Sequence, residues 1–440
     1  MNTAILGGGL AGLTLGSLLE DGFTIYEREA ECGGLCRSEK RRGFTFDRGG
    51  SHIIFSRDEG ALRFMLDALG GNVVRNRRDT RILLDGRYIK YPFENGLAGL
   101  PPQDRYECLL TYVNRLIARE KGAPAPKNFR EWIPYTFGEG MAERYMIPYN
   151  EKIWSHPLED IALDWVEGRV PSPPVEDVIR SAVGIETEGY LHQLHFFYPQ
   201  EGGIQALPDS LAARAGGRIR TGSGILSIRG RRGRWTVDTE TGSDEFDRLV
   251  STIPLQELAK VMDLPEKVSS AIGRLWYNSL VTVVVGAEGE GQDLSWLYVP
   301  GKEDGRANRV SFPSNFSPMV APEGCHSLLA EITCKHGDEV WGMEDAAVIE
   351  ESVGALARLG LVDPSRILVA DVFRSRYAYV INDHDRRGNM AVIERYFKEL
   401  GVSLCGRFSE FEYLNMDATV DSAKRTVGGM RSEHGGDDHR

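Results

Sequence analysis

The sequence predicts an α/β protein with a discontinuous first domain, a helical insertion and an antiparallel β-sheet domain. Three observations indicate this arrangement. Residues 2–6 have the pattern of a short apolar strand that leads directly into a glycine turn and an apolar helix. Residues 97–189 change to helical periodicity, and the sequence from Gly202 returns to short strands separated by glycine turns. The chain is therefore expected to leave its first domain and to re-enter it.

The boundaries follow from where the periodicity changes. We expect the first domain at residues 1–92, 200–255 and 365–425, the helical domain at 93–199, and the antiparallel sheet domain at 256–364. Within the helical domain, residues 105–120 and 129–144 have helical periodicity. The sequence from Gly428 offers Met430 as its only large apolar side chain, so residues 426–440 are expected to form a flexible tail.

Length, charge and cysteine content exclude several classes of protein. A chain of 440 residues can bury a large core, and 52 basic against 64 acidic residues give a net charge of −12. This charge opposes nonspecific binding to nucleic acid or to an anionic membrane. No apolar run reaches membrane-spanning length, and the six cysteines form no C-x-x-C or metal-ligand spacing. We therefore expect a cytoplasmic protein with no metal site and no membrane span.

The glycine turn that follows the first strand has a spacing typical of dinucleotide binding. Gly7 permits a tight turn, Gly9 lets a pyrophosphate approach the backbone, and Gly12 allows close packing of helix and strand. Glu27 ends the second strand, where a carboxylate can accept hydrogen bonds from ribose hydroxyls. The alternative is an ordinary glycine-rich βα turn. The strand–turn–helix context favours a Rossmann-like dinucleotide site.

Two further glycine pairs, Gly33-Gly34 and Gly49-Gly50, follow soon afterwards, and a nicotinamide-binding unit has no need of them. FAD is a longer ligand, and the chain resembles the FAD-binding superfamily that includes amine oxidases, protoporphyrinogen oxidases and UDP-galactopyranose mutases. The segments from Cys405 and from Tyr413 resemble the C-terminal FAD motif of that superfamily. The FAD-binding residues implied are Gly7, Gly9, Leu10, Ala11, Gly12, Glu27, Arg28, Gly34, Leu35, Arg37, Gly50, Ser51, His52, Gly406, Arg407, Asn415 and Met416.

Several stretches outside the FAD motifs are similar to UDP-galactopyranose mutases, particularly the eukaryotic type. They share order and approximate spacing over most of the chain. These stretches are HIIFS at 52–56, YPF at 91–93, PYNEKIW at 148–154, WVEGR at 165–169, WLY at 296–298, Arg309 with SNFS at 314–317, Tyr379 and Tyr413. The resemblance implies a nucleoside-diphosphate sugar as the substrate.

In that family, arginines at the positions of Arg169 and Arg309 hold the substrate diphosphate, a role suited to the bidentate guanidinium group. Tyrosine hydroxyls at Tyr298, Tyr379 and Tyr413 are implied to assist them. The alternative for the arginines is a pair of surface salt bridges. The position of His52 matches a histidine that lies beside the flavin in a mobile loop, so His52 is grouped with the two arginines as catalytic; its alternative is a structural histidine.

Asn150 and Trp154 lie four residues apart on an expected helix and are implied to line the nucleotide and sugar pocket. Tyr91 and Phe93 are similar to residues that flank the nucleobase. The eukaryotic mutases have glutamine at the next position, whereas this chain has Glu94. A carboxylate only accepts hydrogen bonds, which suits the adjacent donors of guanine better than uracil. The base is therefore hypothesised not to be uracil, unless Glu94 points to solvent or pairs with an arginine.

The resemblance implies a redox-neutral reaction, in which reduced FAD attacks the anomeric carbon through N5 and pyranose and furanose forms interconvert. NAD(P)H is the implied reductant. Two alternatives stay open: an FAD-dependent oxidoreductase of the amine oxidase or protoporphyrinogen oxidase type, and a protein that keeps FAD for a structural role. The many charges between residues 105 and 121 favour the mutase over an oxidase with an apolar tunnel. The sequence leaves a homo-oligomer open.

Overall fold

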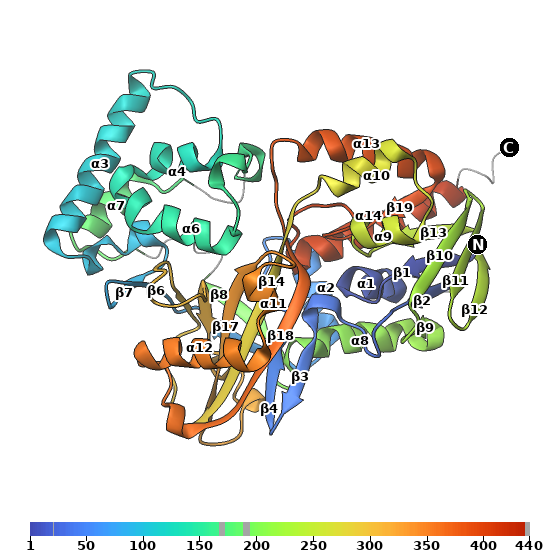
Figure 1. The fold of residues 1–440 in the computed structure, drawn as a ribbon, viewed down its shortest axis with the longest axis horizontal. Helices are drawn as coiled ribbons and strands as arrows, with labels where there is room; N and C mark the ends of the chain where they lie inside the picture. Colours follow the sequence, from blue (N-terminus) through green and yellow to red (C-terminus); the bar gives the residue numbers. More distant parts are fainter. Residues whose placement is uncertain (21, 167–171, 188–193, 436–440) are drawn as a thin grey trace.

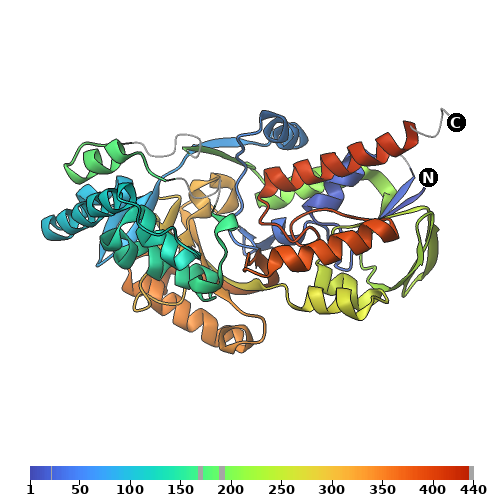
Figure 2. The same cartoon turned by 90° about the horizontal axis from the view of Figure 1, so that it is seen from above.

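The computed structural model describes residues 1–20, 22–166, 172–187 and 194–435. Its two main sheets form the centres of two regions, and the helical insertion lies beyond the second sheet (Figure 1). Seen from above, the molecule is elongated, with the helical insertion at one end and the parallel sheet at the other (Figure 2). The expected α/β class is confirmed.

The parallel sheet forms the first region, and all its hydrogen-bonded neighbours run parallel. Its strands, in spatial order, are β19 (Val402–Leu404), β13 (Arg248–Ser251), β1 (Thr3–Leu6), β2 (Phe23–Tyr26) and β9 (Ile219–Arg220). Ile5 belongs to the core on one face, whereas Ala4 and Leu6 belong to the core on the other. Because both faces are covered, β1 is a continuous apolar run rather than an alternating one.

Helices cover both faces of this sheet. On one face lie α1 (Leu10–Leu18), α2 (Glu59–Leu69), α8 (Ala206–Ala215) and α14 (Met416–Gly435); on the other lie α9 (Leu255–Val261), α10 (Glu266–Gly273) and α13 (Arg386–Leu400). A three-stranded meander of β10 (Ile225–Arg231), β11 (Arg234–Thr239) and β12 (Gly242–Phe246) completes the region. Residues 10–16 of α1 are all buried, because α8 and α14 pack against this helix.

The second region is a seven-stranded sheet flanked by α11 (Glu339–Gly342) and α12 (Asp345–Arg358). Its strands, in spatial order, are β18 (Ile367–Val380), β14 (Tyr277–Glu288), β17 (Cys325–Cys334), β16 (Arg309–Ser311), β15 (Trp296–Tyr298), β6 (Thr80–Leu84) and β7 (Arg87–Lys90). All neighbours are antiparallel except β15 and β6. Two further antiparallel pairs complete the strands: the hairpin of β3 (Ser38–Arg41) with β4 (Phe44–Asp47), and β5 (Val74–Arg77) with β8 (His195–Tyr198), which are distant in the sequence.

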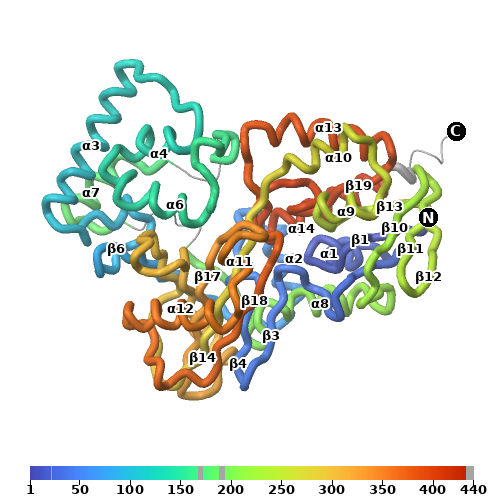
Figure 3. Tube along the Cα trace, viewed as in Figure 1, coloured from blue at the N-terminus to red at the C-terminus, as the bar shows by residue number. Residues whose placement is uncertain are grey.

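Three parts of the expected domain bounds are wrong, because strand pairing and helix packing across the chain decide them. Residues 80–90 and 367–380 are expected in the first domain, but as β6, β7 and β18 they belong to the seven-stranded sheet. Residues 256–273 are expected in the antiparallel sheet domain, but they contain most of α9 and all of α10, which cover the parallel sheet. The expected flexible tail is also wrong for residues 426–435, which form the end of α14. Val427 and Met430 are 3% and 7% exposed there, so this end of the helix packs against the core together with the buried residues before it. The tube in Figure 3 follows these repeated crossings between regions.

The insertion consists of α3 (Pro102–Glu120), α4 (Phe129–Phe137), α5 (Glu139–Met141), a π-helical turn at Ala142–Met146, α6 (Ile147–Trp154) and α7 (Val175–Ala182). The helix expected over 129–144 is interrupted at Gly138, whose φ is +76°. A Cβ there would lie 2.5 Å from the Tyr112 backbone nitrogen, so only glycine permits this approach of α3. Among the described residues, no helix is long and apolar enough to cross a bilayer.

Candidate cofactor and ligand site

A cleft of about 570 Å³ opens at the carboxyl end of the parallel sheet, next to the residues that directly follow β1, β2, β13 and β19. This edge is where open α/β sheets bind ligands. Its lining includes these expected residues: Gly7, Gly9, Leu10, Ala11, Glu27, Arg28, Gly34, Leu35, Arg37, His52, Gly406, Arg407 and Met416. Motifs from both ends of the chain therefore meet in one cleft.

The glycine turn is held by close backbone contacts. A Cβ on Gly12 would lie 2.0 Å from the Gly7 carbonyl oxygen, so the third glycine is required for the packing of α1 on its own turn. Gly7 has a φ of +102°, in the left-handed region. The second glycine pair lies directly beside this turn, because the Gly33 amide donates to the Gly8 carbonyl at 2.8 Å. The two motifs form one continuous backbone surface.

Glu27 lies at the end of β2 and is 9% exposed. Its Oε2 accepts a hydrogen bond from the Gly8 amide at 2.8 Å, and its Oε1 accepts one from the Glu29 amide at 2.9 Å. Each carboxylate oxygen has a second lone pair that can accept a bond from a hydroxyl group. The carboxylate therefore fixes the glycine turn and still presents acceptors to the cleft.

Basic residues at the cleft are partly neutralised by acidic neighbours. Arg37 is 13% exposed and lies 3.7 Å from Glu29 and 3.6 Å from Glu31, whereas Arg28 is 63% exposed. Arg407 donates to the carbonyls of Leu414 at 2.7 Å and Ala378 at 2.9 Å, so these two bonds use no carboxylate. Arg407 is therefore the stronger source of positive potential deep in the cleft.

Four residues expected at the cofactor do not line the cleft. Gly12 supports the turn from behind, and Asn415 is exposed at the start of α14. Gly50 and Ser51 face the seven-stranded sheet instead: a Cβ on Gly50 would lie 2.9 Å from a Glu331 carboxylate oxygen, and Ser51 bonds to Trp296. The loop of residues 49–52 thus has one side on the cleft and one on the sheet.

The donor and acceptor set of the cleft fits a dinucleotide such as FAD. The backbone turn leaves no room for side chains at Gly7 or Gly12, the N-terminus of α1 points its amides at the cleft, and Glu27 is placed for a ribose. The two glycine motifs lie side by side, because Gly9 and Gly33 form a parallel bridge, so the glycine-lined backbone extends beyond a single turn. Among the described residues, no group of three or more His, Cys, Asp or Glu side chains is arranged to hold a metal.

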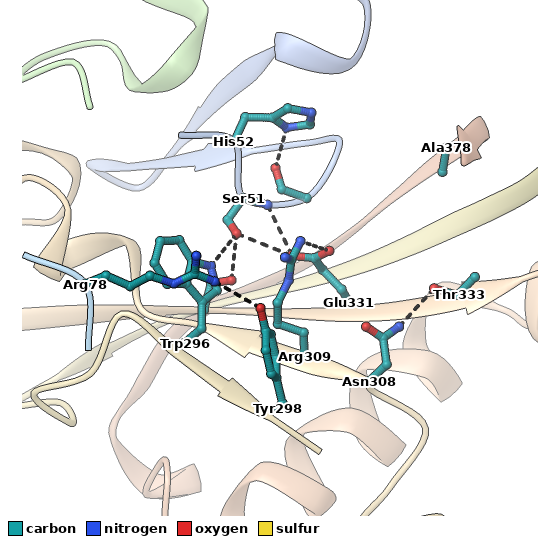
Figure 4. Close-up of polar contacts among 12 residues, drawn as sticks. Ser51, His52, Arg78, Trp296, Tyr298, Asn308, Arg309, Glu331, Thr333 and Ala378 are labelled. Atoms are coloured by element: carbon teal, nitrogen blue, oxygen red, sulfur yellow. Dashed lines mark hydrogen bonds and ion pairs between the residues drawn. The ribbon is translucent and has the colours of Figure 1, made fainter. Parts of the chain in front are cut away.

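The second part of the site is a row of polar residues across three neighbouring strands. Tyr298 on β15 pairs directly with Arg309 on β16, and Arg309 pairs with Glu331 on β17, so the three side chains lie on one face of the sheet (Figure 4). Arg309 donates to Glu331 through Nε at 2.9 Å and through Nη2 at 2.6 Å. Burial acts to lower the pKa of Arg309, but the Glu331 carboxylate outweighs this effect, and the net pKa lies well above its usual value, so the guanidinium stays charged.

Helix α6 covers this row. Trp154 donates from Nε1 to the Asn150 side chain at 3.2 Å, which confirms that the two residues share one helix face. The Trp154 ring lies 6.4 Å from the Tyr379 ring and 6.2 Å from the Tyr413 ring, while Tyr379 and Tyr413 stack at 6.0 Å. Residues that are widely separated in the sequence are brought into one aromatic wall.

The segment at Tyr91 forms the far end of the aromatic wall. The Tyr91 ring lies 5.0 Å from Tyr298, and Phe93 is fully buried 5.1 Å from Tyr145. Glu94 is 2% exposed, so the alternative that it points to solvent is wrong. Burial raises the pKa of Tyr145, and the nearby tyrosines and Glu94 raise it further, which places this carboxylate among aromatic rings.

His52 lies where the two parts of the site meet. Its Nδ1 is 3.0 Å from the Gly50 carbonyl oxygen, so Nδ1 carries the proton in that bond, and the ring lines the cleft. Burial lowers the pKa of His52 to about 4, and the charges of Arg407 and Arg309 add to this effect. His52 is therefore neutral at physiological pH. The predicted partner Arg169 lies outside the described residues.

Several lining residues were missed by sequence reasoning. They are Ser223, Gly224, Ile225, Thr252, Ile253, Pro254, Glu257, Lys260 and the stretch 374–377 of β18. Thr252 directly follows β13, so its place could have been inferred from the carboxyl-end rule for parallel strands. Arg78 was also missed; it donates to the Tyr298 hydroxyl at 3.1 Å and lies 5.0 Å over the Trp296 ring. No local motif identifies Arg78 or the β18 stretch.

The fold and the site together define a flavoprotein of a known family. Residues 10–430 match the family of flavin containing amine oxidoreductases, and the chain belongs to this family. The family implies a flavin as the cofactor, and the cleft described above provides the backbone and charged groups to hold it.

Solved structures show which folds the chain is similar to. A crystal structure of reduced UDP-galactopyranose mutase superimposes with a TM-score of 0.87 at 24% identity, covering 97% of this chain and 95% of that one. A putative protoporphyrinogen oxidase from Exiguobacterium sp. 255-15 gives 0.75 at 17% identity, covering 98% and 99%. A putrescine oxidase bound to putrescine gives 0.68 at 16% identity, also covering 98% and 99%. The chain therefore shares its fold with a mutase and with two oxidases.

Proposed function

We propose that the protein is a flavin-dependent mutase that interconverts the pyranose and furanose forms of a nucleoside-diphosphate sugar. One observation carries the proposal: a charged, partly buried arginine, Arg309, lies on the sheet face near the histidine that lines the cofactor cleft. A diphosphate bound at Arg309 would place the attached sugar toward His52 and the cofactor. The implied reductant of the flavin is NAD(P)H, and the proposed location is cytoplasmic.

The residues of this chain would bind and orient the substrate. Arg309 holds the diphosphate while it leaves and returns, and the hydroxyls of Tyr298, Tyr379 and Tyr413 donate to its oxygens. The wall formed by α6 excludes water from the sugar. When bound, reduced flavin supplies the nucleophile for the anomeric carbon. His52 stays neutral beside the cleft, so it adds no charge that would compete for the diphosphate.

The amine oxidase alternative is opposed by the charge of the site. Oxidation of an amine requires a pocket that accepts a cation, yet Arg309 and Arg407 both lie close enough to His52 to lower its pKa. A protein that keeps flavin for structure alone has no need of a charged, partly buried arginine beneath an aromatic wall. The site therefore favours an anionic substrate.

Glu94 is proposed to select the nucleobase. Its carboxylate accepts but does not donate, which suits the two adjacent donors of guanine better than uracil. Titration of the flavin-loaded protein with UDP and with GDP tests this point separately from the reaction type. We expect tighter binding of GDP, and a strong preference for UDP would overturn the role given to Glu94.

Product analysis under anaerobic conditions tests the reaction type. The protein is incubated with UDP-galactofuranose and, separately, with the corresponding GDP sugar, first with oxidised flavin and then after reduction by dithionite or NADPH. We expect conversion of one of them to the pyranose only after reduction. Stoichiometric hydrogen peroxide in air with an amine or another oxidisable substrate would indicate an oxidase, and absence of peroxide formation and of conversion with either nucleotide sugar would indicate a structural role.

A further inference from the structure

Glu331 contacts both halves of the site. It lies on β17, is 1% exposed, and accepts hydrogen bonds from Arg309 through both carboxylate oxygens. The same carboxylate, through Oε1, accepts a bond from the Ser51 backbone amide at 3.2 Å. Figure 4 shows this carboxylate between the arginine and the loop that carries His52. One buried acid is thus shared by the ligand side and the cofactor side.

The bonds of Glu331 use both of its oxygens as acceptors. Oε1 accepts from Arg309 Nε and from the Ser51 amide, and Oε2 accepts from Arg309 Nη2. An amide in this place would turn an NH₂ group toward at least one N–H donor. Because the Nε and Nη2 edge of Arg309 faces Glu331, a ligand would meet Arg309 through its remaining edge, which includes Nη1.

The loop is held to the sheet at the same point by its serine side chain. Ser51 Oγ accepts a bond from Trp296 Nε1 at 2.9 Å and lies 2.9 Å from Ser311 Oγ. Trp296, Ser311 and Glu331 lie on β15, β16 and β17, so Ser51 is attached to three consecutive strands. The next residue is His52, which lines the cofactor cleft. A shift of Glu331 would therefore move Arg309 and this loop together.

We infer that Glu331 is a positioning residue that sets the orientation of Arg309 toward the ligand and the position of the loop at residues 50–52 toward the cofactor. The inference rests on the proposed role of Arg309 in diphosphate binding. It assigns to Glu331 a coupling between the two halves of the site: a ligand on Arg309 alters the surroundings of the cofactor through this carboxylate. By linkage, the state of the cofactor alters ligand affinity to the same extent.

A pure charge effect and a positioning role of Glu331 predict opposite changes in ligand affinity when Glu331 is replaced by glutamine. Removal of a negative charge next to Arg309 would strengthen the binding of an anion if charge alone mattered. Loss of the two-oxygen contact would let Arg309 leave its orientation, which weakens binding. Glu331→Asp keeps the charge but withdraws the carboxylate by one methylene. Charge alone therefore predicts unchanged ligand affinity, whereas the positioning role predicts weaker binding.

The test is calorimetric titration of the flavin-loaded protein with UDP and with GDP, together with the change in visible flavin absorbance at saturation. We expect Glu331→Gln and Glu331→Asp each to weaken binding at least tenfold and to reduce the ligand-induced absorbance change by at least half. Glu351→Gln is the matched control, because Glu351 is an exposed acid of the same region, paired with Arg306 at 2.7 Å. It should match the wild type.

The outcomes separate this inference from the proposed function. If the wild type binds neither nucleotide, or if Arg309→Ala does not weaken binding, the role of Arg309 fails. If the wild type binds in an Arg309-dependent way but Glu331→Gln binds equally or more tightly, the positioning role of Glu331 is wrong. If the glutamine variant does not fold, Glu331→Asp is the test: weaker binding supports the positioning role, and unchanged binding contradicts it.

Discussion

The cofactor cleft and the ligand side of the site are built in different ways. The cleft is formed largely by backbone, where glycines allow turns that no other residue permits, as the 2.0 Å separation between a Cβ on Gly12 and the Gly7 carbonyl oxygen shows. The ligand side is formed by side chains from separate strands and α6, centred on Arg309 and Glu331. Substitutions in the cleft should act through steric overlap, and those on the ligand side through lost contacts.

The largest effect is expected from Gly12→Val. Its Cβ and branched methyl groups would overlap the Gly7 carbonyl, so α1 could not pack on its turn. We expect no flavin to copurify with the variant, measured by absorbance near 450 nm. Gly428→Ala is the matched control, because Gly428 also lies in a helix but has no atom within 4 Å of its Cβ position. The control should keep its flavin and gain up to about 1 kcal/mol of stability.

Arg309→Ala should spare the cleft but weaken the ligand side. We expect about a hundredfold weaker binding of nucleoside diphosphate, since a charge-assisted bidentate contact is lost and Glu331 is left buried without its partner. Calorimetry measures the affinity, and the flavin content should stay near that of the wild type. Arg306→Ala is the matched control, because the Arg306 side chain is 39% exposed and pairs with the acids Glu339 and Glu351. This variant should bind nucleoside diphosphate as the wild type does.

His52 gives a pH-dependent prediction at the junction of the two parts. Its pKa is about 4 in the folded protein and about 6.5 when unfolded, so the unfolded chain takes up a proton first as the pH falls. The folded state therefore loses about 1–2 kcal/mol of stability between pH 7 and pH 5, and His52→Asn should lack this loss. Guanidinium unfolding of both proteins at the two pH values measures the difference, and equal pH dependence would contradict the neutral His52.

Asn150→Ala is expected to have the smallest effect. The variant loses the 3.2 Å bond from Trp154 Nε1 and the 2.7 Å bond from Asn150 to the Met146 carbonyl. One neutral hydrogen bond contributes about 1 kcal/mol, so we expect a three- to tenfold rise in KM with flavin content unchanged. Steady-state kinetics measure it, with Asn114→Ala on the exposed side of α3 as the control. An unchanged KM would place Asn150 outside the ligand pocket.

The two parts also differ in how far the sequence predicts them. The turn at Gly7, the placement of Glu27 and the meeting of the C-terminal motif with the N-terminal strand could be predicted, because each depends on local spacing and on one topological rule. The expected helix face of Asn150 and Trp154 also follows from spacing alone. These features depend on few residues at short range.

The row of polar residues on β15, β16 and β17 could be predicted only in part, because Tyr298 and Arg309 follow from the family resemblance and Glu331 does not. Glu331 and Arg78 reach the site only through strand pairing across β15, β16, β17 and β6, and no local pattern records that register. The same reason explains the misplaced boundaries at residues 80–90 and 367–380, whose strands pair with distant segments. Burial of Glu94 likewise depends on the packing of the insertion around it rather than on its own sequence.

The proposed reaction is tested most directly by the ratio of reductant consumed to product formed under anaerobic conditions. The flavin is reduced once, the excess reductant is removed, and the nucleoside-diphosphate sugar is added. The proposal predicts many turnovers of pyranose and furanose forms with the flavin still reduced at the end. Reoxidation of one flavin for each product formed would contradict it and would identify an oxidoreductase.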